Sequence, residues 1–466
     1  MNGYFTTSTT EQAIPIIPIV GSEFPGWIEK QNAKLKNWIR INEFKAKSAT
    51  LCLVPDRNGQ LKQIFLGIDN QNDFWAFGTL PNKLSEGTYQ VEADLTANQQ
   101  QKIAIAWGLG NYKFTVYKKS PTSKAKLLIP ETCDLQYIEN VITSISLVRD
   151  LINYPAEDME PASLAKAVLS TAIEFNANVE QVIGDDLLKK GYAAIHAVGR
   201  ASNHAPRLID LKWGKEKNPK VTLIGKGVCF DSGGLDLKPR ADMEKMKGDM
   251  AGAAHALGLA KMIMAADLPV SLRVLIPAVE NMLASNSYKP GDILKTYKKI
   301  TVEVVDTDAE GRLILADALT IACEDKPELI IDFATLTGAV YIAMGNEIAA
   351  LFSNNDDIAR QIVAIAEQEN DPICRLPLHQ PYRELLDSDI ADISNISNGR
   401  GGSSIIAALF LKEFVDSNIP WLHFDFAAYN LIDKPGRPKG GEAQTLRALF
   451  QYLLKSFVES ESLGSK

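Results

Sequence analysis

Beyond Glu180 the chain repeats one pattern: a short β-rich run, a loop, and a longer stretch whose apolar residues have helical spacing. Strands that alternate with helices in this way form a largely parallel sheet covered by helices on both faces. The β-rich runs lie at Ala193–Val198, Lys220–Ile224, Leu272–Ala278, Val302–Val305, Leu329–Phe333 and Trp421–Phe426. The pattern predicts an α/β fold with a large three-layer domain around a mostly parallel sheet.

A smaller α/β domain is predicted for the first part of the chain. Ala49–Ile68 holds two apolar runs around Asn58-Gly59, a dipeptide typical of tight hairpin turns. Lys102–Val116 is expected to add a strand, a glycine-rich bend and another apolar run. Pro25–Phe44 is expected to form a helix with its proline in the first turn.

A helix is expected to connect the two domains. Apolar residues recur at helical spacing from Asp134 to Asn153, and Pro155 ends this helix because the residue before a proline avoids the α region. A second helix is expected at Pro161–Phe175. We assign residues 1–130 to an N-terminal α/β domain, a candidate for oligomer contacts or regulation, 131–155 to the connecting helix, and 156–466 to the large α/β domain.

The net charge and the residue composition argue against several classes of binding partner. A net charge of −8 and a pI near 5.4 disfavour general binding to nucleic acid or anionic membranes. The N-terminal stretch has neither the basic region of a signal peptide nor the length of a membrane span. The five cysteines form no CxxC pair, which favours a reducing cytoplasm. Because the five histidines lack metal-ligand spacing, carboxylates are the expected ligands of any metal.

Charged side chains gather in the stretch Val302–Leu319, which is expected to run from a strand through an acidic turn into a helix. Asp308 and Glu310 are two residues apart, so in extended backbone both carboxylates would project to the same side. A single Asp-x-Glu is more often a surface loop that caps a helix. The stretch becomes informative only together with other loops.

Two further loops carry charge beside many glycines. Lys226 and Asp231 lie in a glycine-rich segment after the strand at 220–224, and Lys238 follows soon afterwards. Asp249 is expected in the first turn of a small-residue helix. With Asp308 and Glu310 this makes four carboxylates on three loops, which would repel one another without cations. Two divalent metal ions about 3.5 to 4 Å apart would relieve the repulsion and activate a water for hydrolysis.

These segments resemble the signature segments of the leucine aminopeptidase (cytosol aminopeptidase) family of two-metal exopeptidases. The matching segments are GKGVCFDSGG, LKP, KGDMAGAA, DTDAEGRL, RDLINYPAEDMEP, PAVENM, DFATLTGA, GSSIIAALFLKEFV and WLHFDFAA. The resemblance covers about 138–454 and is weak over the first 130 residues, where the family is variable. It implies a leucyl aminopeptidase that removes an N-terminal residue, with Leu or another apolar residue preferred, from peptides with a free N-terminus.

The resemblance also implies roles for individual residues. One metal would be held by Asp231, Asp308 and Glu310, and the other by Lys226, Asp231, Asp249 and Glu310. Lys238 would polarise the scissile carbonyl or its oxyanion. Arg312 would hold a bicarbonate that relays a proton. The first side-chain pocket would be lined by Met246, Thr335, Leu336, Gly338 and Ala427.

Metal identity and assembly follow from the same comparison. The ligand set favours Mn²⁺ or Mg²⁺ by hardness, and Zn²⁺ is compatible by affinity. The family implies a cytoplasmic homohexamer formed as a dimer of trimers. Two segments depart from the family pattern. Asp306 stands where Asn is usual, and would either add charge beside the metals or cap the turn; Arg437–Gln444 leaves the substrate preference open.

Two alternatives remain open from the sequence. A carboxylate-rich two-metal site also suits a phosphoesterase, because such sites clamp phosphoryl groups. The same fold could serve a non-catalytic structural or DNA-architectural role, since fold does not determine function. The complete set of Lys, Arg and carboxylate residues argues against a degenerate site, and the acidic net charge argues against DNA.

Overall fold

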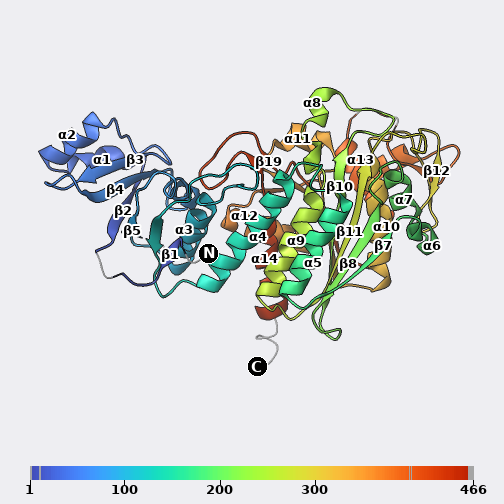
Figure 1. Ribbon diagram of the computed structural model, residues 1–466, viewed down its shortest axis with the longest axis horizontal. Helices are drawn as coiled ribbons and strands as arrows, with labels where there is room; N and C mark the ends of the chain where they lie inside the picture. Colours follow the sequence, from blue (N-terminus) through green and yellow to red (C-terminus); the bar gives the residue numbers. More distant parts are fainter. Residues whose placement is uncertain (1–2, 10–11, 398, 400, 460–466) are drawn as a thin grey trace. The chain divides into compact units, whose positions relative to one another are not determined.

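The computed structural model describes residues 3–9, 12–397, 399 and 401–459, and the chain forms two compact units. The first unit comprises Met1–Ser146 with Asn430–Lys439, and the second comprises Leu147–Tyr429 with Gly440–Lys466. Each unit combines helices with a β-sheet, as expected of an α/β protein (Figure 1). No helix among the described residues has both the length and the apolar character needed to span a membrane.

The first unit is built on a six-stranded sheet in the order β1-β6-β5-β2-β4-β3. β3 and β4 form the predicted antiparallel hairpin, with Gly59 at φ +81° in its turn. The remaining neighbours are parallel. The strands are β1 (Phe5–Thr6), β2 (Ile14–Val20), β3 (Leu51–Pro55), β4 (Leu61–Ile68), β5 (Gly87–Val91) and β6 (Ala125–Leu128), and the helices are α1 (Phe24–Glu29), α2 (Ala33–Ile41), η1 (Phe74–Thr79) and α3 (Ala97–Gly110).

Two predictions for the first unit were wrong. Lys102–Val116 does not contain a strand, because its first part belongs to α3. Residues 103–110 of this helix are all buried, so the sequence there shows no polar face that would reveal a helical period. The single helix expected at Pro25–Phe44 is two helices. Asn32 begins the second of them, since its side chain accepts the N–H of Leu35 at 3.0 Å.

The second unit contains a nine-stranded sheet in the order β16-β15-β18-β14-β9-β11-β8-β7, with β10 paired to β11. Its centre, from β18 through β14 and β9 to β11, is parallel as predicted. Antiparallel pairs occur toward both edges. The strands are β7 (Asn178–Ile183), β8 (Arg207–Trp213), β9 (Lys220–Gly225), β10 (Gly227–Asp231), β11 (Ser271–Asn281), β14 (Leu329–Ala334), β15 (Ala349–Ser353), β16 (Ile373–Arg375) and β18 (Trp421–Asp425).

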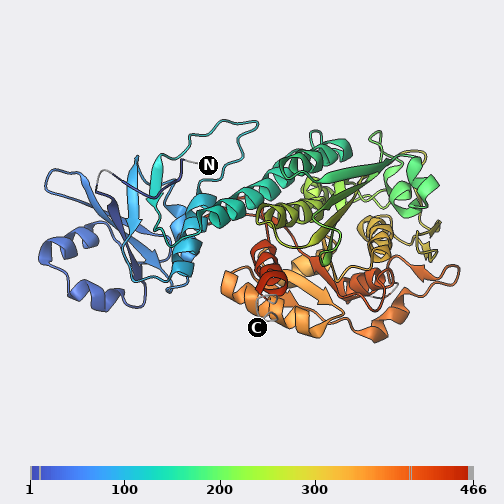
Figure 2. The ribbon, with the colours of Figure 1, turned by 90° about the horizontal axis from the view of Figure 1, so that it is seen from below.

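Helices cover both faces of this sheet, as Figures 1 and 2 show. α5, α9 and α14 lie on one face, and α7, α10 and α13 share a hydrophobic core with β11 on the other. The predicted helices before and after Pro155 are confirmed as α4 and α5. The main helices are α4 (Leu135–Asn153), α5 (Pro161–Glu174), α9 (Ala251–Ala265), α10 (Glu310–Glu324), α12 (Asp356–Glu369), α13 (Ser403–Lys412) and α14 (Leu446–Leu454), and the shorter ones are α6 (Asp186–Lys190), α7 (Ala193–Gly199), α8 (Arg240–Met243), η2 (Met246–Gly248), α11 (Gly338–Met344), η3 (Gln380–Leu386) and η4 (Lys455–Glu459).

Two of the predicted strands of the large sheet lie elsewhere. Ala193–Val198 forms most of helix α7, a short buried segment in which helix and strand patterns look alike. Val302–Val305 overlaps β13 (Thr301–Glu303), which belongs to a separate three-stranded sheet with β12 (Ile293–Lys295) and β17 (Ile393–Ser394). The acidic loop after β13 therefore does not follow a strand of the large sheet.

Candidate metal centre

Lys226 lies between β9 and β10, at the edge of the large sheet where its central parallel strands end. Its backbone is held on both sides, because its N–H donates to Phe333 O at 3.0 Å and its carbonyl accepts from Ala253 N at 2.9 Å. Its side chain passes Gly311 of α10 closely. A Cβ added at Gly311 would lie 2.7 Å from Lys226 Nζ, so any larger residue at this position would displace the lysine side chain.

Lys226 contacts two of the predicted carboxylates. Its Nζ lies 2.8 Å from Asp249 Oδ1 and 2.8 Å from Glu310 Oε1, and all three side chains are at most 5% exposed. Glu310 is the first residue of α10. Asp249 is not in the first turn of α9 as predicted, because it precedes the N-cap Met250. It follows a short 3-10 turn instead, so its orientation depends on side-chain contacts.

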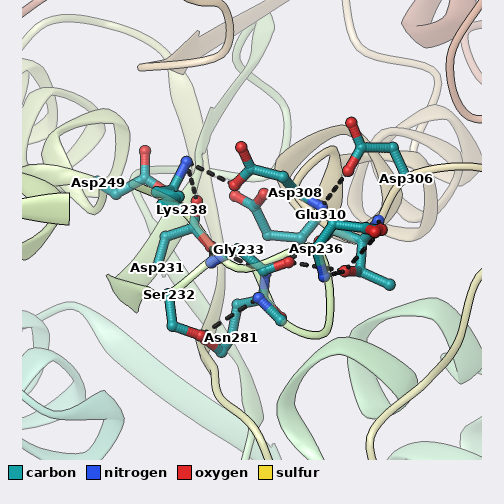
Figure 3. Close-up of polar contacts among 12 residues, drawn as sticks. Asp231, Ser232, Gly233, Asp236, Lys238, Asp249, Asn281, Asp306, Asp308 and Glu310 are labelled. Atoms are coloured by element: carbon teal, nitrogen blue, oxygen red, sulfur yellow. Dashed lines mark hydrogen bonds and ion pairs between the residues drawn. The ribbon is translucent and has the colours of Figure 1, made fainter. Parts of the chain in front are cut away.

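Lys238 contacts the other two carboxylates. Its Nζ lies 2.9 Å from Asp231 Oδ2 and 2.5 Å from Asp308 Oδ1 (Figure 3). One oxygen each of Asp231, Asp308 and Glu310 lies within 4.8 Å of the others, close enough to hold a metal ion. The structure thus brings together all four carboxylates and both lysines. Asp308 and Glu310 converge from a turn and a helix start, not from extended backbone as the sequence suggested.

The electrostatics of this cluster reflect crowded negative charge. Burial and the neighbouring Asp231 raise the pKa of Asp308 to about 7, although Lys238 opposes the shift. Burial raises the pKa of Asp249 well above its usual range, against the opposing effect of Lys226. Burial alone would lower the pKa of Lys226, but Asp249, Glu310 and Asp231 outweigh it and the pKa is raised. In the absence of other cations, the negative charge of these carboxylates is therefore offset by bound protons and by the lysine ammonium groups.

The residues fit divalent metal ions. Carboxylate oxygens suit hard divalent cations, and one amine is compatible with Mn²⁺ or Zn²⁺. Asp249 Oδ2 is buried and has no hydrogen-bond partner within the described residues. A buried carboxylate oxygen without a donor is costly, and a cation would satisfy it.

Asp306 caps the turn that carries Asp308. Its Oδ1 accepts the Asp308 N–H at 2.8 Å, and its carboxylate lies beyond Asp308 as seen from Lys238 (Figure 3). It is not among the three carboxylates grouped within metal-binding distance in the described part of the chain. Of the two roles considered for Asp306, the structure shows the turn cap.

Asn395, which follows β17, clamps the same turn and was missed from the sequence. Its Oδ1 accepts from Val305 N at 2.8 Å, its Nδ2 donates to Asp306 O at 2.6 Å, and its backbone carbonyl accepts from Arg312 Nη1 at 2.6 Å. It lies far from the turn in sequence, and an asparagine in a loop carries no local signal of such a contact.

Arg312 is a buried cation, 7% exposed, two residues beyond Glu310. Burial lowers the pKa of its guanidinium to about 10, although Glu310, Asp425 and Asp306 oppose the shift. Its Nε is buried without a hydrogen-bond partner in the part of the chain that the structure describes. The arrangement is suited to an anion.

Asn281 joins the two ligand-bearing loops and also escaped the sequence prediction, although its motif PAVENM was noted. Its Nδ2 donates to Asp231 Oδ1 at 2.8 Å and to Thr307 O at 3.0 Å. Tyr288 adds its hydroxyl to Thr307 O at 2.5 Å. These contacts fix the position of Asp231 relative to the turn at Asp308.

The predicted pocket residues lie on neighbouring segments of the second unit. Thr335 and Leu336 follow β14, Gly338 begins α11, Ala427 follows the adjacent strand β18, and Met246 begins η2. Thr335 is joined directly to the centre, because its carbonyl accepts from Lys226 Nζ at 3.0 Å and its Oγ1 donates to Asp249 Oδ1 at 2.7 Å.

Two family models match most of the chain. The family model for the catalytic domain of the cytosol aminopeptidase family matches residues 146–450, and the model for the M17 aminopeptidase N-terminal domain matches residues 14–130. A probable cytosol aminopeptidase of Chlamydia abortus is 41% identical over 362 residues, covering 74% of this chain and 72% of the relative.

Solved structures agree. The crystal structure of a cytosol aminopeptidase from Coxiella burnetii has a TM-score of 0.93 at 48% identity and covers 97% of this chain and 99% of that chain. The bottromycin maturation enzyme BotP in complex with Mn has a TM-score of 0.85 at 30% identity, and the match covers 94% and 98% of the two chains.

Proposed function

This chain belongs to the cytosol aminopeptidase family and is a metal-dependent aminopeptidase, and we propose that it uses two divalent metal ions to remove single N-terminal residues from peptides. The resemblance seen in the sequence motifs is thereby confirmed. The observation that carries the proposal is the convergence of Asp231, Asp308 and Glu310 with Lys226 and Asp249.

The ligand assignment keeps the division implied by the motifs. Asp231, Asp308 and Glu310 would hold one ion, and Lys226 and Asp249, with shared oxygens of Asp231 and Glu310, the other. Lys226 would bind as the neutral amine, since a cation beside the carboxylates removes the reason for its raised pKa. When bound, the ions supply Lewis acidity and lower the pKa of a water.

Lys238 and Arg312 are the proposed catalytic residues. Lys238 is positioned as an ammonium group between Asp231 and Asp308, where it can stabilise an oxyanion that develops on the scissile carbonyl. Arg312 would hold a bicarbonate that accepts the proton of the attacking water. Among the described residues nothing accepts from the buried Nε of Arg312, which supports this role because a small anion would give it an acceptor.

Other features of the proposal rest on the family. Leu or another apolar residue would occupy a pocket lined by Met246, Thr335, Leu336, Gly338 and Ala427. The native metal would be Mn²⁺ or Zn²⁺, with Mg²⁺ an option. We also propose a cytoplasmic homohexamer; a sedimentation mass near that of one or two chains at micromolar concentration would contradict it.

The function is tested by hydrolysis of leucine-4-nitroanilide with protein loaded with Mn²⁺, Zn²⁺, Mg²⁺ or Co²⁺. We expect turnover of the free-amino substrate and none of its N-acetyl derivative. Asp249→Asn should abolish activity, whereas Asp242→Asn, the same exchange at an exposed position of α8, should not change it. Absence of peptide cleavage with every metal, or release of phosphate from 4-nitrophenyl phosphate instead, would refute the proposal.

A further inference from the structure

The segment 335–337 connects β14 to α11 and contacts the metal centre through Thr335. Lys226 Nζ donates to Thr335 O at 3.0 Å, and Thr335 Oγ1 donates to Asp249 Oδ1 at 2.7 Å. Lys226 and Asp249 therefore both take part of their orientation from one residue of this segment. Any shift of the segment would move an acceptor of Lys226 and a donor to Asp249 together.

The segment is in turn held by Asp425, the last residue of β18. Asp425 lies beside Ala334 in the parallel register of β14 and β18. Its Oδ1 accepts the N–H groups of Leu336 at 2.8 Å and Thr337 at 3.3 Å, and its Oδ2 accepts the Thr337 hydroxyl at 2.7 Å. Asp425 is 1% exposed, so water cannot readily replace it.

Different side chains orient the other ligands. Asp231 accepts from Asn281 and from the Gly233 N–H, and the turn that carries Asp308 is held by Asn281, Tyr288 and Asn395. The contacts of Asp425 lead to the Lys226 and Asp249 side of the centre. Loss of the Asp425 carboxylate should thus affect one metal more than the other.

We propose that Asp425 is a positioning residue for the metal held by Lys226 and Asp249, and that it acts through the segment 335–337. The inference rests on the proposed two-metal function. Partners that orient metal ligands typically change metal affinity or activity by about 10- to 100-fold when they are replaced. Because Thr335 and Leu336 are also proposed pocket residues, the same carboxylate would align the substrate pocket with this metal.

A purely structural role is the alternative, and the chain contains a matched control for it. Asp371 is also a buried carboxylate in the second unit, 5% exposed, that accepts backbone N–H groups at the start of an element. It accepts from Thr445 at 2.8 Å, Arg447 at 3.1 Å and Ala448 at 3.3 Å at the beginning of α14. Replacing either aspartate by asparagine removes an acceptor of backbone N–H groups, and at Asp371 it also removes an ion pair with Arg447 Nε at 3.9 Å.

The test is to titrate three metal-free proteins with Mn²⁺: Asp425→Asn, Asp371→Asn and the unmodified protein. Mn²⁺ binding is measured by calorimetry and by electron paramagnetic resonance. We expect Asp425→Asn to weaken one of two Mn²⁺ sites by about 10- to 100-fold and leave the other within twofold. Asp371→Asn should lower the unfolding temperature but leave both affinities within twofold. Equal Mn²⁺ binding by Asp425→Asn and unmodified protein, or equal weakening in both variants, would overturn the inference.

A second variant covers the case in which Asp425→Asn does not fold. Thr337→Val removes only the hydroxyl that donates to Asp425 Oδ2, and it should weaken the same Mn²⁺ site in the same direction. Unchanged binding by this variant would then overturn the inference. The binding readout is independent of turnover. If unmodified protein binds two Mn²⁺ but cleaves no peptide, the proposed function fails while the role of Asp425 is still decided.

Discussion

Asp317 offers a prediction in which the direction of a pH effect separates two physical causes. It is fully buried on α10, and its carboxylate accepts backbone N–H groups from Ala194 at 3.0 Å, Ile195 at 3.3 Å and Tyr297 at 2.8 Å. Burial raises its pKa from 3.8 to about 7, and the three N–H donors only partly oppose the shift. The folded protein therefore holds a proton on Asp317 in a range where the unfolded chain has lost it.

The sign and size of the effect follow from linkage. Between pH 4 and pH 7 the folded state binds one more proton than the unfolded state at this site, so stability falls as the pH rises. One pKa unit corresponds to about 1.4 kcal/mol, so the two units between pH 5 and pH 7 amount to about 3 kcal/mol. The loss levels off about one unit above the folded-state pKa, near pH 8, where Asp317 is ionised in both states.

Asp317→Asn removes the titration and keeps one acceptor oxygen. At pH 5 the variant should be less stable by about 1 to 3 kcal/mol, because buried N–H groups are left without an acceptor. By pH 8 this gap should have closed or reversed, since only the unmodified protein carries the buried charge. The measurement is urea unfolding of both metal-free proteins at equal concentration, followed by circular dichroism at pH 5, 6, 7 and 8.

All other titrating groups are the same in the two proteins, so their effects cancel in the difference between the two free energies of unfolding. A gap that stays constant from pH 5 to pH 8 would show that the folded-state pKa of Asp317 lies below this range, because the three N–H donors offset burial and keep the carboxylate charged. That result would refute the reasoning.

Three further predictions concern strain, ligand positioning and a buried ion pair. Thr445 has a left-handed backbone with φ +66°, and its buried hydroxyl has no hydrogen-bond partner among the described residues. Glycine adopts this φ without strain and has no hydroxyl, so Thr445→Gly should stabilise the protein by about 1 kcal/mol. A lower melting temperature would contradict this. Asn395→Ala should lower kcat/KM by about 10- to 100-fold with unchanged circular dichroism, because it frees the turn before Asp308; a change below twofold would show that the turn holds itself. Arg149→Met should lower the free energy of unfolding in urea by about 3 to 5 kcal/mol, since buried Glu442 loses a partner at 2.9 Å. Adding Glu442→Leu should restore part of this free energy. If the effects of the two replacements simply add, the explanation is excluded.

The candidate site residues of this protein could be chosen from local sequence. Lys226, Asp231, Lys238, Asp249, Asp308, Glu310 and Arg312 were all chosen from glycine-rich or acidic loops, and the structure gathers the four carboxylates and both lysines. Short segments carry this information because a metal site needs particular side chains at particular spacings. The central strands of the parallel sheet were equally visible, since strands buried on both faces are continuous apolar runs.

Errors arose where burial removed the periodic signal. α3 and α7 are short or uniformly buried helices, and their sequences lack the polar face that distinguishes a helix from a strand. β13 was correctly placed in the chain but joins a different sheet, because strand partners are chosen by contacts distant in sequence. The first unit, expected to resemble the family only weakly, matches the N-terminal domain model over 14–130.

By itself, therefore, the sequence indicated which side chains are candidates to bind metal and placed most of them beside the ends of strands or the start of a helix. Only the tertiary structure decided how those side chains are held. Asp306 could have faced the metals or capped its turn, and the backbone N–H of Asp308 at 2.8 Å settled it. Asn281, Asn395 and Asp425 act on loops from which they are separated by 26 to 90 residues. Hydrogen bonds between such distant segments form only when the fold brings them together, and no local pattern records them.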